Sequence, residues 1–229
     1  ACEEHRIDLL VVGPEASLAV GIADAFSGHR TRVVGPTRFA ARLESSKIWA
    51  KAFMRRHGIP TAESRLVGSR EEFAAFAGER GGSAVLKADG LAAGKGVAVC
   101  HGPGEVEREW ARIAAIRPPA ERFLAEARLV GWEVSVHVLT DGEAWCGFPA
   151  SQDHKRLSDG DRGPNTGGMG ALCPVAACDR ALMKRVGDEI VEPTLGGLAS
   201  DGIPYRGFLY VGLMITESGP QVLEYNVRL

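Results

Sequence analysis

Short apolar runs alternate with amphipathic stretches over the first forty residues of the chain. The run IDLLVV ends at Gly13-Pro14 and predicts a buried strand, and SLAVGIADAFS then predicts a helix that begins near Ser17 or Glu15. TRVVGPT repeats the arrangement with a second short strand and Gly35-Pro36. Strand and helix alternating at this pace predict part of a parallel α/β layer.

A helical apolar stripe follows in SKIWAKAFMRRHGIPTA. Apolar residues recur at helical spacing from Ile48 to Phe53, so we predict a helix from about Ser46 to His57 that ends before Gly58 and Pro60. The stretch PTAES, which comes next, is the first expected boundary, and we place the end of the N-terminal unit at residue 62.

Residues 63–126 predict a compact α+β unit. SRLV is a short strand, and SREEFAAFAGER is a helix with a capping box from Ser69 to Glu72. SAVLKA and GVAVC are two strands on either side of a glycine-rich loop, and GPGEVEREWARIAAI is a second helix.

Residues 127–229 predict a second α+β unit. WEVSVHVLT and EAWCGFPA are strands around a turn at Asp141-Gly142, and a long helix from about Asp179 to Ala199 is interrupted near Pro193. RGFLYVGLMIT and PQVLEYNVRL then form an antiparallel pair. The chain begins without Met and stops directly after this pair, so we expect a piece of a longer polypeptide.

Composition narrows the class of protein. The chain has 229 residues, 45% of them hydrophobic and 24% charged, which suits a globular protein with a sizeable core. A formal net charge of -2 argues against a nucleic-acid binder that works by bulk electrostatics. No apolar run approaches the roughly 18 residues of a membrane span, and the polar first residues are unlike a signal peptide. The 5 scattered cysteines fit reduced thiols in the cytoplasm.

The segment KADGLAAGKGV, residues 87–97, combines two lysines with a glycine-rich backbone. Backbone N–H groups in such loops, together with lysines, typically hold phosphate. The segment is not a P-loop, because Lys95 is followed by Gly96 and not by Ser or Thr. Most lysines are solvated on the surface, but Lys87 ends an apolar strand, which favours a functional position.

A second unusual segment, QDHKRLSDGDRGPNTGGMGAL, covers residues 152–172 and contains almost no apolar residues. Structureless segments of this length are usually functional or disordered. This one gathers charged and amide side chains that linkers do not favour, so we predict a substrate loop. The gathered residues are His154, Lys155, Arg156, Asp159, Asp161, Arg162 and Asn165.

The last strand offers a candidate metal site. Alternation along LEYNV predicts that Leu223, Tyr225 and Val227 face the core, while Glu224 and Asn226 share the other face. One carboxylate and one amide oxygen suit Mg²⁺, which takes its other ligands from phosphates and water. An ordinary half-exposed strand produces the same alternation, so the pattern alone leaves both readings open.

Six stretches resemble, in order and over nearly the whole chain, the phosphoribosylamine–glycine ligase family of the ATP-grasp superfamily. They are VVGPEASLAVGI, LESSKIWAKAF, VLKADGLAAGKGV, SQDHKRLSDGDRGPNTGGMGA, GFLYVGLMI and LEYNVRL. The resemblance implies an ATP-grasp fold, in which two α+β subdomains, residues 63–126 and 127–229, sandwich ATP. Residues 1–62 are then the remainder of a Rossmann-like parallel α/β domain. Because the family's chains are longer at both ends, we expect a fragment whose large subdomain is truncated.

The resemblance also implies an activity. The family's enzymes join glycine to 5-phosphoribosylamine through glycyl phosphate, giving glycinamide ribonucleotide, ADP and phosphate in purine biosynthesis. The cofactors expected are ATP and Mg²⁺, or Mn²⁺ in its place, and we expect a cytoplasmic monomer with neither nucleic-acid nor membrane partners. Two alternatives stay open: an ATP-grasp carboxylate–amine ligase with other substrates, and a truncated fragment that binds nucleotide without turnover.

Site residues follow from the same resemblance. Lys87, Lys95 and Arg228 are expected to be catalytic, and Glu224 and Asn226 to hold metal. In the nucleotide site, Glu126 lies against adenine, Leu129 under its ring and Glu133, seven residues on, against the ribose hydroxyls. The nucleotide-binding set is Lys47, Lys87, Gly94, Lys95, Glu126, Leu129 and Glu133. The substrate set is Gly13, Pro14, Glu15, Asp153, Lys155, Arg156, Asp161, Asn165 and Arg228.

The sequence departs from the family pattern at two places. AEARLVGWEVS stands where the family often has Glu-Glu-Phe-Leu and Gly-Glu-Glu, with Ala127, Arg128 and Trp132 as the differences. Gly212 takes the place where many ATP-grasp relatives carry an aspartate, so the expected metal site depends mainly on Glu224. The turn at Gly13–Glu15 is as well explained by structure as by substrate binding.

Overall fold

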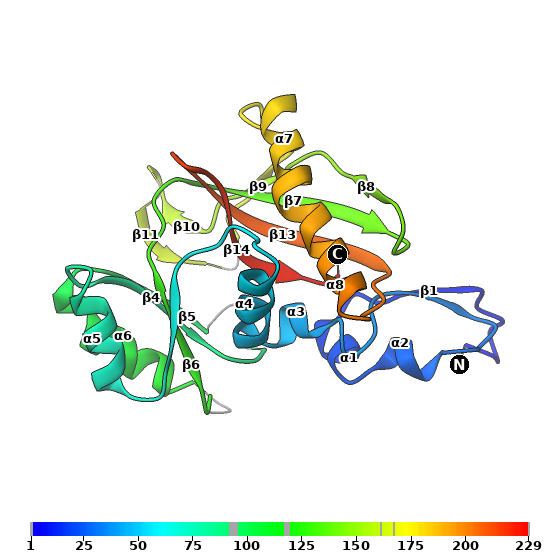
Figure 1. Ribbon diagram of the computed structural model, residues 1–229, viewed down its shortest axis with the longest axis horizontal. Helices are drawn as coiled ribbons and strands as arrows, with labels where there is room; N and C mark the ends of the chain where they lie inside the picture. The colour runs from blue at the N-terminus through cyan, green and yellow to red at the C-terminus, as the bar shows by residue number, and fades with distance from the viewer. Residues whose placement is uncertain (1, 92–95, 117–119, 161, 167, 229) are drawn as a thin grey trace.

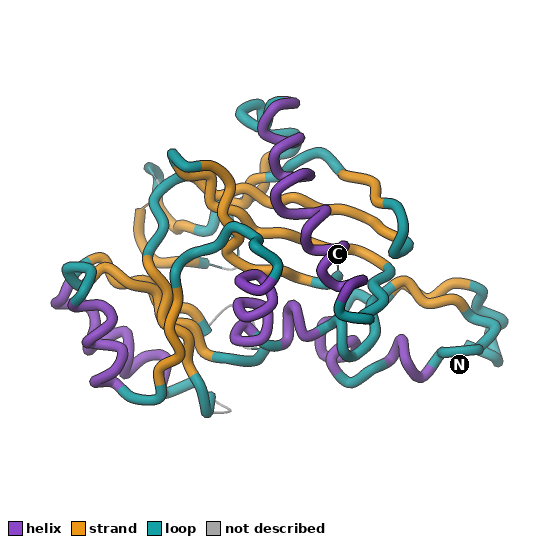
Figure 2. The backbone as a smooth tube through the Cα atoms, viewed as in Figure 1, coloured by secondary structure: helices purple, strands orange, loops and turns teal. Residues whose placement is uncertain are grey.

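A computed structural model describes residues 2–91, 96–116, 120–160, 162–166 and 168–228 (Figures 1 and 2). Two four-stranded antiparallel sheets dominate the described chain, and a helical segment, α4 (Lys47–Arg56), lies between them. A pair of short parallel strands projects at the N-terminal end. The predicted order of a parallel α/β segment followed by two α+β units is confirmed in this arrangement.

The N-terminal segment contains the predicted strands, β1 (Leu9–Val11) and β2 (Arg32–Val34), which pair in parallel. The prediction that the first strand is buried is wrong, because Leu9 and Val11 of this two-stranded sheet are exposed. The single helix predicted after it is two short helices, α1 (Glu15–Ala19) and α2 (Ile22–Ala25). Gly21 separates them with a φ of 92°, a left-handed conformation that glycine adopts without strain.

Helix α4 follows a short helix, α3 (Arg42–Ser45), and matches its prediction. Ser46 is the N-cap, and its hydroxyl accepts a hydrogen bond from the Trp49 N–H. Gly58, with a φ of 66°, follows the C-cap residue His57 and ends the helix. This cap fixes the start of α4, and so it determines which side chains of its first turn face the two sheets.

The smaller sheet has the strand order β3-β6-β4-β5. Its strands are β3 (Ser64–Val67), β4 (Ser83–Ala88), β5 (Val97–His101) and β6 (Phe123–Ala127). Helices α5 (Arg70–Gly78) and α6 (Pro103–Ala114) cover it (Figure 1). The predicted capping box is present in part, since Ser69 accepts from the Glu72 N–H while the Glu72 carboxylate accepts from the Gly68 N–H.

The larger sheet has the order β14-β13-β7-β8. Its strands are β7 (Trp132–Thr140), β8 (Trp145–Gly147), β13 (Gly207–Thr216) and β14 (Gly219–Asn226). The predicted long helix is continuous but not uniform: α7 (Arg180–Val186) passes through a π-helical turn (Gly187–Val191) into α8 (Glu192–Ser200). In place of the interruption expected near Pro193, the helix changes type there, and the π-helical turn ends two residues before that proline.

The polar segment 152–172 was predicted to lack regular structure, and this is wrong for its ends and its middle. β9 (Gln152–Asp153) pairs with β12 (Ala171–Leu172), and β10 (Arg156–Ser158) pairs with β11 (Arg162–Asn165). Backbone hydrogen bonds satisfy the chain here, which is why a segment with few apolar side chains, the large ones exposed, still takes an ordered path.

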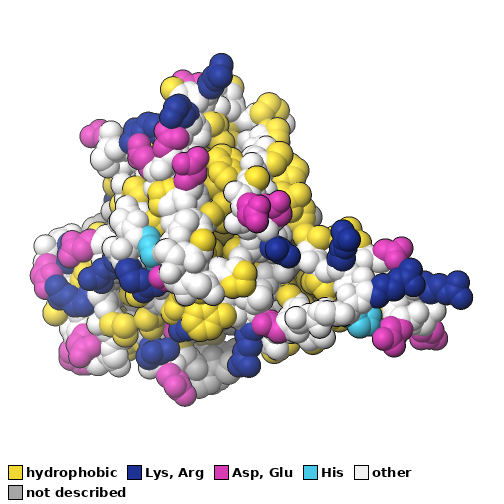
Figure 3. Space-filling view, turned by 45° about the vertical axis from the view of Figure 1, so that its right-hand side comes forward, with side chains coloured by type: hydrophobic (Ala, Val, Ile, Leu, Met, Phe, Trp, Pro, Cys, Tyr) yellow, Lys and Arg dark blue, Asp and Glu magenta, His cyan; other side chains and the backbone are white. Residues whose placement is uncertain are grey.

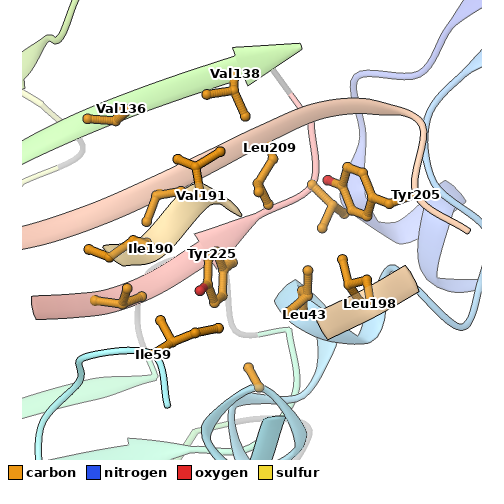
Figure 4. Close-up of a cluster of buried hydrophobic side chains, with 14 of the residues drawn as sticks. Leu43, Ile59, Val136, Val138, Ile190, Val191, Leu198, Tyr205, Leu209 and Tyr225 are labelled. Carbon is orange, nitrogen blue, oxygen red and sulfur yellow. The ribbon is translucent and has the colours of Figure 1, made fainter. Parts of the chain in front are cut away.

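Buried apolar side chains form two clusters. One fills the space between the smaller sheet and its helices, and Phe73 and Phe76 are its largest fully buried members. The other joins the N-terminal segment to the larger sheet and to α8. In Figure 4, Leu43 of α3 and Leu198 of α8 point toward the space below Tyr205 and Tyr225. Burial of a large apolar side chain stabilises by roughly 1.5–3 kcal/mol, so this second cluster firmly fixes α4 beside β14.

Lys, Arg, Asp and Glu side chains are interspersed over the face shown in Figure 3. This mixing agrees with the small net charge of -2. Within the described residues, no helix combines the length and the apolar character that crossing a membrane requires.

Candidate functional site

Helix α4 places two lysines one turn apart on the side that faces the smaller sheet. Lys47 Nζ donates to the Gly90 carbonyl at 2.9 Å. Asp89 fixes the start of the helix, because its carboxylate accepts from the Ser46 hydroxyl at 3.0 Å and from the Ile48 N–H at 3.2 Å. The beginning of the glycine-rich segment is thereby tied to the helix N-terminus, where a carboxylate is favourable.

Lys51, the second lysine of α4, is only 3% exposed. Its ammonium group lies 3.1 Å from Glu126 Oε1 and donates to Thr61 Oγ1 at 2.7 Å and to the Ala62 carbonyl at 3.3 Å. Burial lowers the pKa of Lys51 to about 8, and the nearby Glu126 carboxylate only partly opposes this. Lys51 is thus a buried ammonium group in the wall of the site, held by three protein acceptors.

Lys87, at the end of β4, is 7% exposed and reaches across to the larger sheet. Its ammonium group lies 3.0 Å from Glu126 Oε2 and donates to the Leu223 carbonyl at 2.8 Å. Glu126, on β6, therefore holds one lysine on each carboxylate oxygen. The two sheets meet at this cluster of buried charges.

A β-bulge makes the Leu223 carbonyl available. The register of β13 and β14 shifts between Gly212, opposite Glu224, and Leu213, opposite Val222, so Leu223 is the extra residue. The prediction that Leu223 faces the core is wrong for this reason: Val222 is fully buried in its place, while Tyr225 and Val227 are buried as expected. Strict alternation cannot anticipate a bulge.

A cavity of about 210 Å³ lies between α4, the smaller sheet and β14. Lys47, Lys51, Lys87, Glu224 and Asn226 all line it. Burial lowers the pKa of Lys47, and the Glu224 carboxylate opposes that shift. The cavity wall combines ammonium groups, which neutralise an anion, with one carboxylate and one amide oxygen, which suit a divalent cation. Beyond this pair, no cluster of three or more Asp, Glu, His or Cys ligands occurs in the described parts of the chain.

Arg228 closes another part of the same cavity. Its Nε lies 3.2 Å from Glu15 and 3.3 Å from Glu44, and the Glu44 carboxylate also accepts from the Val227 N–H at 2.8 Å. Burial raises the pKa of Glu44, although its hydrogen bond with Val227 and the Arg228 charge oppose this. The end of β14 is thus connected to the N-terminal segment through a guanidinium and two carboxylates.

A smaller cavity of about 30 Å³ adjoins the first, and Leu223 and Glu224 line both. Its polar residues are Glu133, Ser135, Asp153, Lys155, Tyr210 and Glu224. Burial alone lowers the pKa of Lys155, but the fields of Tyr210 and the nearby carboxylates outweigh burial and raise it. Lys155 is therefore fully protonated at neutral pH and presents a positive charge beside Glu224.

The two cavities bring most of the predicted site residues together. Lys47, Lys87, Glu126, Glu224, Asn226, Arg228 and Glu15 line the larger one, and Glu133, Asp153 and Lys155 line the smaller one. Gly13, Pro14 and Leu129 line neither. The backbones of Arg156 and Asn165 pair with each other across β10 and β11. Gly94, Lys95 and Asp161 lie outside the described residues, so their predicted roles stay predictions.

Four polar residues of these cavities were not predicted from the sequence: Lys51, Glu44, Tyr210 and Ser135. Lys51 follows Lys47 by four residues, so both lie on one helix face, and this spacing was the available signal. Glu44 and Tyr210 carry no comparable local signal, because each is brought to its cavity by the pairing of distant segments.

Comparison with known families gives two matches that together cover the chain. Residues 45–229 match the family described as phosphoribosylglycinamide synthetase, ATP-grasp (A) domain, and residues 1–44 match the N domain of the same synthetase. The ATP-grasp fold prediction is thus confirmed.

Individual relatives agree with these matches. The phosphoribosylamine–glycine ligase of Ralstonia nicotianae is 49% identical over 236 residues, covering 99% of this chain and 55% of the relative. The crystal structure of the Thermotoga maritima phosphoribosylamine–glycine ligase superposes with a TM-score of 0.78 at 39% identity, covering 89% of this chain and 52% of that one. A biotin carboxylase from Campylobacter jejuni has a TM-score of 0.77 at 18% identity, with 100% and 50% coverage, and shows the fold alone. The chain spans about half the length of the ligases that it matches.

Proposed function

The chain belongs to the phosphoribosylglycinamide synthetase family, and from this premise we propose that it carries the nucleotide site of an ATP-dependent ligase that joins glycine to 5-phosphoribosylamine. The observation that carries the proposal is the convergence of Lys87, from mid-chain, and Glu224, from the last strand, on one cavity. Ammonium groups and a carboxylate so placed suit a triphosphate with its divalent cation.

The ligase chemistry needs an activated carboxylate, because a free carboxylate is a poor electrophile. A glycine carboxylate oxygen attacks the γ-phosphorus of ATP, ADP leaves, and glycyl phosphate forms. The amine of 5-phosphoribosylamine then attacks the acyl carbon, phosphate leaves, and the amine loses a proton. In our proposal Lys47 and Lys87 neutralise charge on the phosphates, which is the main requirement of phosphoryl transfer.

Glu224 and Asn226 are the residues that would hold Mg²⁺, or Mn²⁺, in this proposal. Both line the cavity beside the lysines, and one protein carboxylate with one amide oxygen leaves coordination positions for phosphate oxygens and water. The metal ion, when bound, would neutralise charge on the transferred phosphoryl group. Arg228, at the end of the same wall, is our candidate for holding a substrate carboxylate or phosphate.

The adjoining smaller cavity is our candidate for the remaining contacts. Glu133 is proposed to meet the ribose hydroxyls, and Asp153 and Lys155 the amino-acid substrate. Glu126 is proposed to border the adenine, with its two oxygens held by lysines. We further propose units at residues 1–62, 63–126 and 127–229, and we expect a cytoplasmic monomer.

The direct test is product analysis. The chain is incubated with ATP, MgCl₂, glycine and freshly generated 5-phosphoribosylamine, and ADP and glycinamide ribonucleotide are quantified by chromatography. Formation of both products in equal amounts, dependent on both substrates, supports the proposal. ADP release with another carboxylate and amine, but none with this pair, would assign the chain to a ligase with other substrates. The differences from the family pattern at Ala127, Arg128 and Trp132 leave room for that alternative.

A second candidate function is nucleotide binding without turnover. The observation in its favour is the share of the relatives that the chain covers, 55% and 53% for two of the ligases. Calorimetric binding of ATP with no ADP formed in any substrate mixture would select this candidate over the ligase.

A further inference from the structure

Lys51 and Lys87 share one carboxylate but differ in what else they contact. The three protons of the Lys51 ammonium group match its three acceptors, which are Glu126, Thr61 and the Ala62 carbonyl. Lys87 contacts Glu126 and the Leu223 carbonyl, and it lines the cavity. All three ammonium protons of Lys51 therefore have a protein acceptor. Among the described contacts, only two of the three Lys87 ammonium protons have one.

The acceptors of Lys51 are themselves fixed. The Thr61 hydroxyl accepts from Lys51 and donates to the Val222 carbonyl at 2.7 Å, and the Val222 N–H donates to the Pro60 carbonyl at 2.8 Å. The chain around Thr61 is in this way tied to β14 directly beside the bulge at Leu223. Lys51 is therefore held from two directions, by Thr61 and Ala62 and by Glu126 of β6.

The buried cluster of Lys51, Lys87 and Glu126 contains more positive than negative charges. One carboxylate, Glu126, stands between two ammonium groups, so the buried cluster carries one surplus positive charge. Because Lys51 neutralises Glu126 through a fixed ion pair, the surplus belongs to Lys87, which faces the cavity. Without Lys51, Glu126 and Lys87 would form a neutral pair, and this part of the wall would attract phosphate less strongly.

We propose that Lys51 is a positioning residue: by holding and neutralising Glu126, it leaves the charge of Lys87 available to a phosphate group in the cavity. The inference rests on the proposed function only for the identity of the anionic ligand. It concerns affinity for phosphate and does not require that the chain complete the ligase reaction.

The proposed role predicts a pH dependence of phosphate binding. The charged groups that face Lys51 are Glu126 from β6, Lys87 from β4 and Arg55 from its own helix. Its pKa of about 8 means that Lys51 loses its proton above this pH and then no longer neutralises the Glu126 carboxylate. We therefore expect phosphate affinity to fall as pH rises through about 8, because Glu126 then pairs with Lys87 alone.

The test compares two ligands and two single substitutions. ATP with MgCl₂, and adenosine, which has no phosphate, are titrated calorimetrically into the wild type, Lys51→Met, Glu126→Gln and the double variant. Lys51→Met should weaken ATP binding roughly 10-fold or more while changing adenosine binding less than about 3-fold. In the double variant the ratio of ATP to adenosine affinity should return toward the wild-type ratio, because no carboxylate remains to neutralise Lys87.

Matched controls separate this role from a structural one. Lys184→Met removes an exposed lysine and should leave both affinities unchanged. Equal weakening of ATP and adenosine binding by Lys51→Met, or no rescue in the double variant, overturns the proposal. If Lys51→Met or a variant with Glu126→Gln fails to fold, the wild type is titrated at several pH values instead. A ratio of ATP to adenosine affinity that stays constant from about pH 7 to 9 then overturns the proposal. A wild type that binds no ATP refutes both proposals, whereas ATP binding without product refutes only the ligase.

Discussion

Lys87 donates a hydrogen bond to the Leu223 carbonyl at 2.8 Å, although 136 residues separate them in the chain. The contact joins the end of β4 in the smaller sheet to the bulge of β14 in the larger sheet. A carbonyl turned out of the strand ladder by a bulge is available to accept it. The same contact places the Lys87 ammonium group within the cavity that Glu224 and Asn226 line.

Replacing Lys87 with Met should reduce the affinity for Mg·ATP. Hydrogen bonds to charged groups contribute about 1.5–3 kcal/mol, so the loss should be roughly 10- to 150-fold. Folding should survive, because Glu126 keeps its ion pair with Lys51 and the Met side chain retains the apolar stem. Calorimetry measures the affinity. Unchanged ATP binding by a folded Lys87→Met protein is incompatible with the proposed site.

Replacing Glu126 with Gln should destabilise the fold strongly. The substitution leaves Lys51 and Lys87 buried without their carboxylate, and breaking a buried pair costs about 3–5 kcal/mol. Urea unfolding at neutral pH measures the free energy of unfolding. The exposed Glu217, changed to Gln in the same way, should alter it by less than about 0.5 kcal/mol. Similar free energies of unfolding for the two variants would show that the cluster of Lys51, Lys87 and Glu126 contributes little to stability.

The stability contributed by Lys51 should depend on pH in a definite direction. Its pKa is about 8 in the folded chain and 10.5 ordinarily, so between these values the unfolded chain binds more protons. The free energy of unfolding of the wild type relative to Lys51→Met should therefore rise with pH in this window, with a slope approaching about 1.4 kcal/mol per unit. Below about pH 8 the lysine is protonated in both states and the difference should be constant. Urea unfolding at several pH values checks this, and a difference that falls with pH is the contrary result.

Much of the fold was predictable from local pattern. The helix from Ser46 to His57 has an N-cap and a following glycine in the sequence itself, and both lie where expected. The convergence of Lys87, Glu224 and Asn226 followed from the family resemblance, and the cavity agrees with it. The exposure of Leu9 and Val11 was not predictable, because burial of a strand depends on what packs over it.

The parts of the site that pattern missed depend on contacts between distant segments. The bulge at Leu223 arises from the pairing of β13 with β14, and no residue type marks it in the sequence. Lys51 looks like one of many helix-surface lysines until β6 places Glu126 beside it. Such groups become recognisable only when the strands that surround them are in place.

Substitutions at the proposed metal residues should raise the Mg²⁺ requirement. Glu224→Gln removes the one carboxylate of the pair, so the Mg²⁺ concentration for half-maximal ATP binding should increase about 10-fold or more. Asn226→Ala should act in the same direction. The exposed Glu143 serves as a control, because Glu143→Gln should leave the Mg²⁺ titration unchanged. An Mg²⁺ curve for Glu224→Gln that overlays the wild type would place the metal elsewhere.

Gly212, which pairs with Glu224 across the two last strands, should not readily accept a side chain. A Cβ at position 212 would lie 3.2 Å from the Tyr210 hydroxyl and 3.3 Å from Glu224 Cγ, closer than ordinary contacts. Gly212→Ala should therefore destabilise the fold by about 1–3 kcal/mol through overpacking. Because the crowding involves the Tyr210 ring, the same substitution should cost less in a Tyr210→Ala background, by about 0.5 kcal/mol or more. A double-mutant cycle with urea unfolding measures this coupling. Strict additivity would mean that the Tyr210 side chain does not limit position 212.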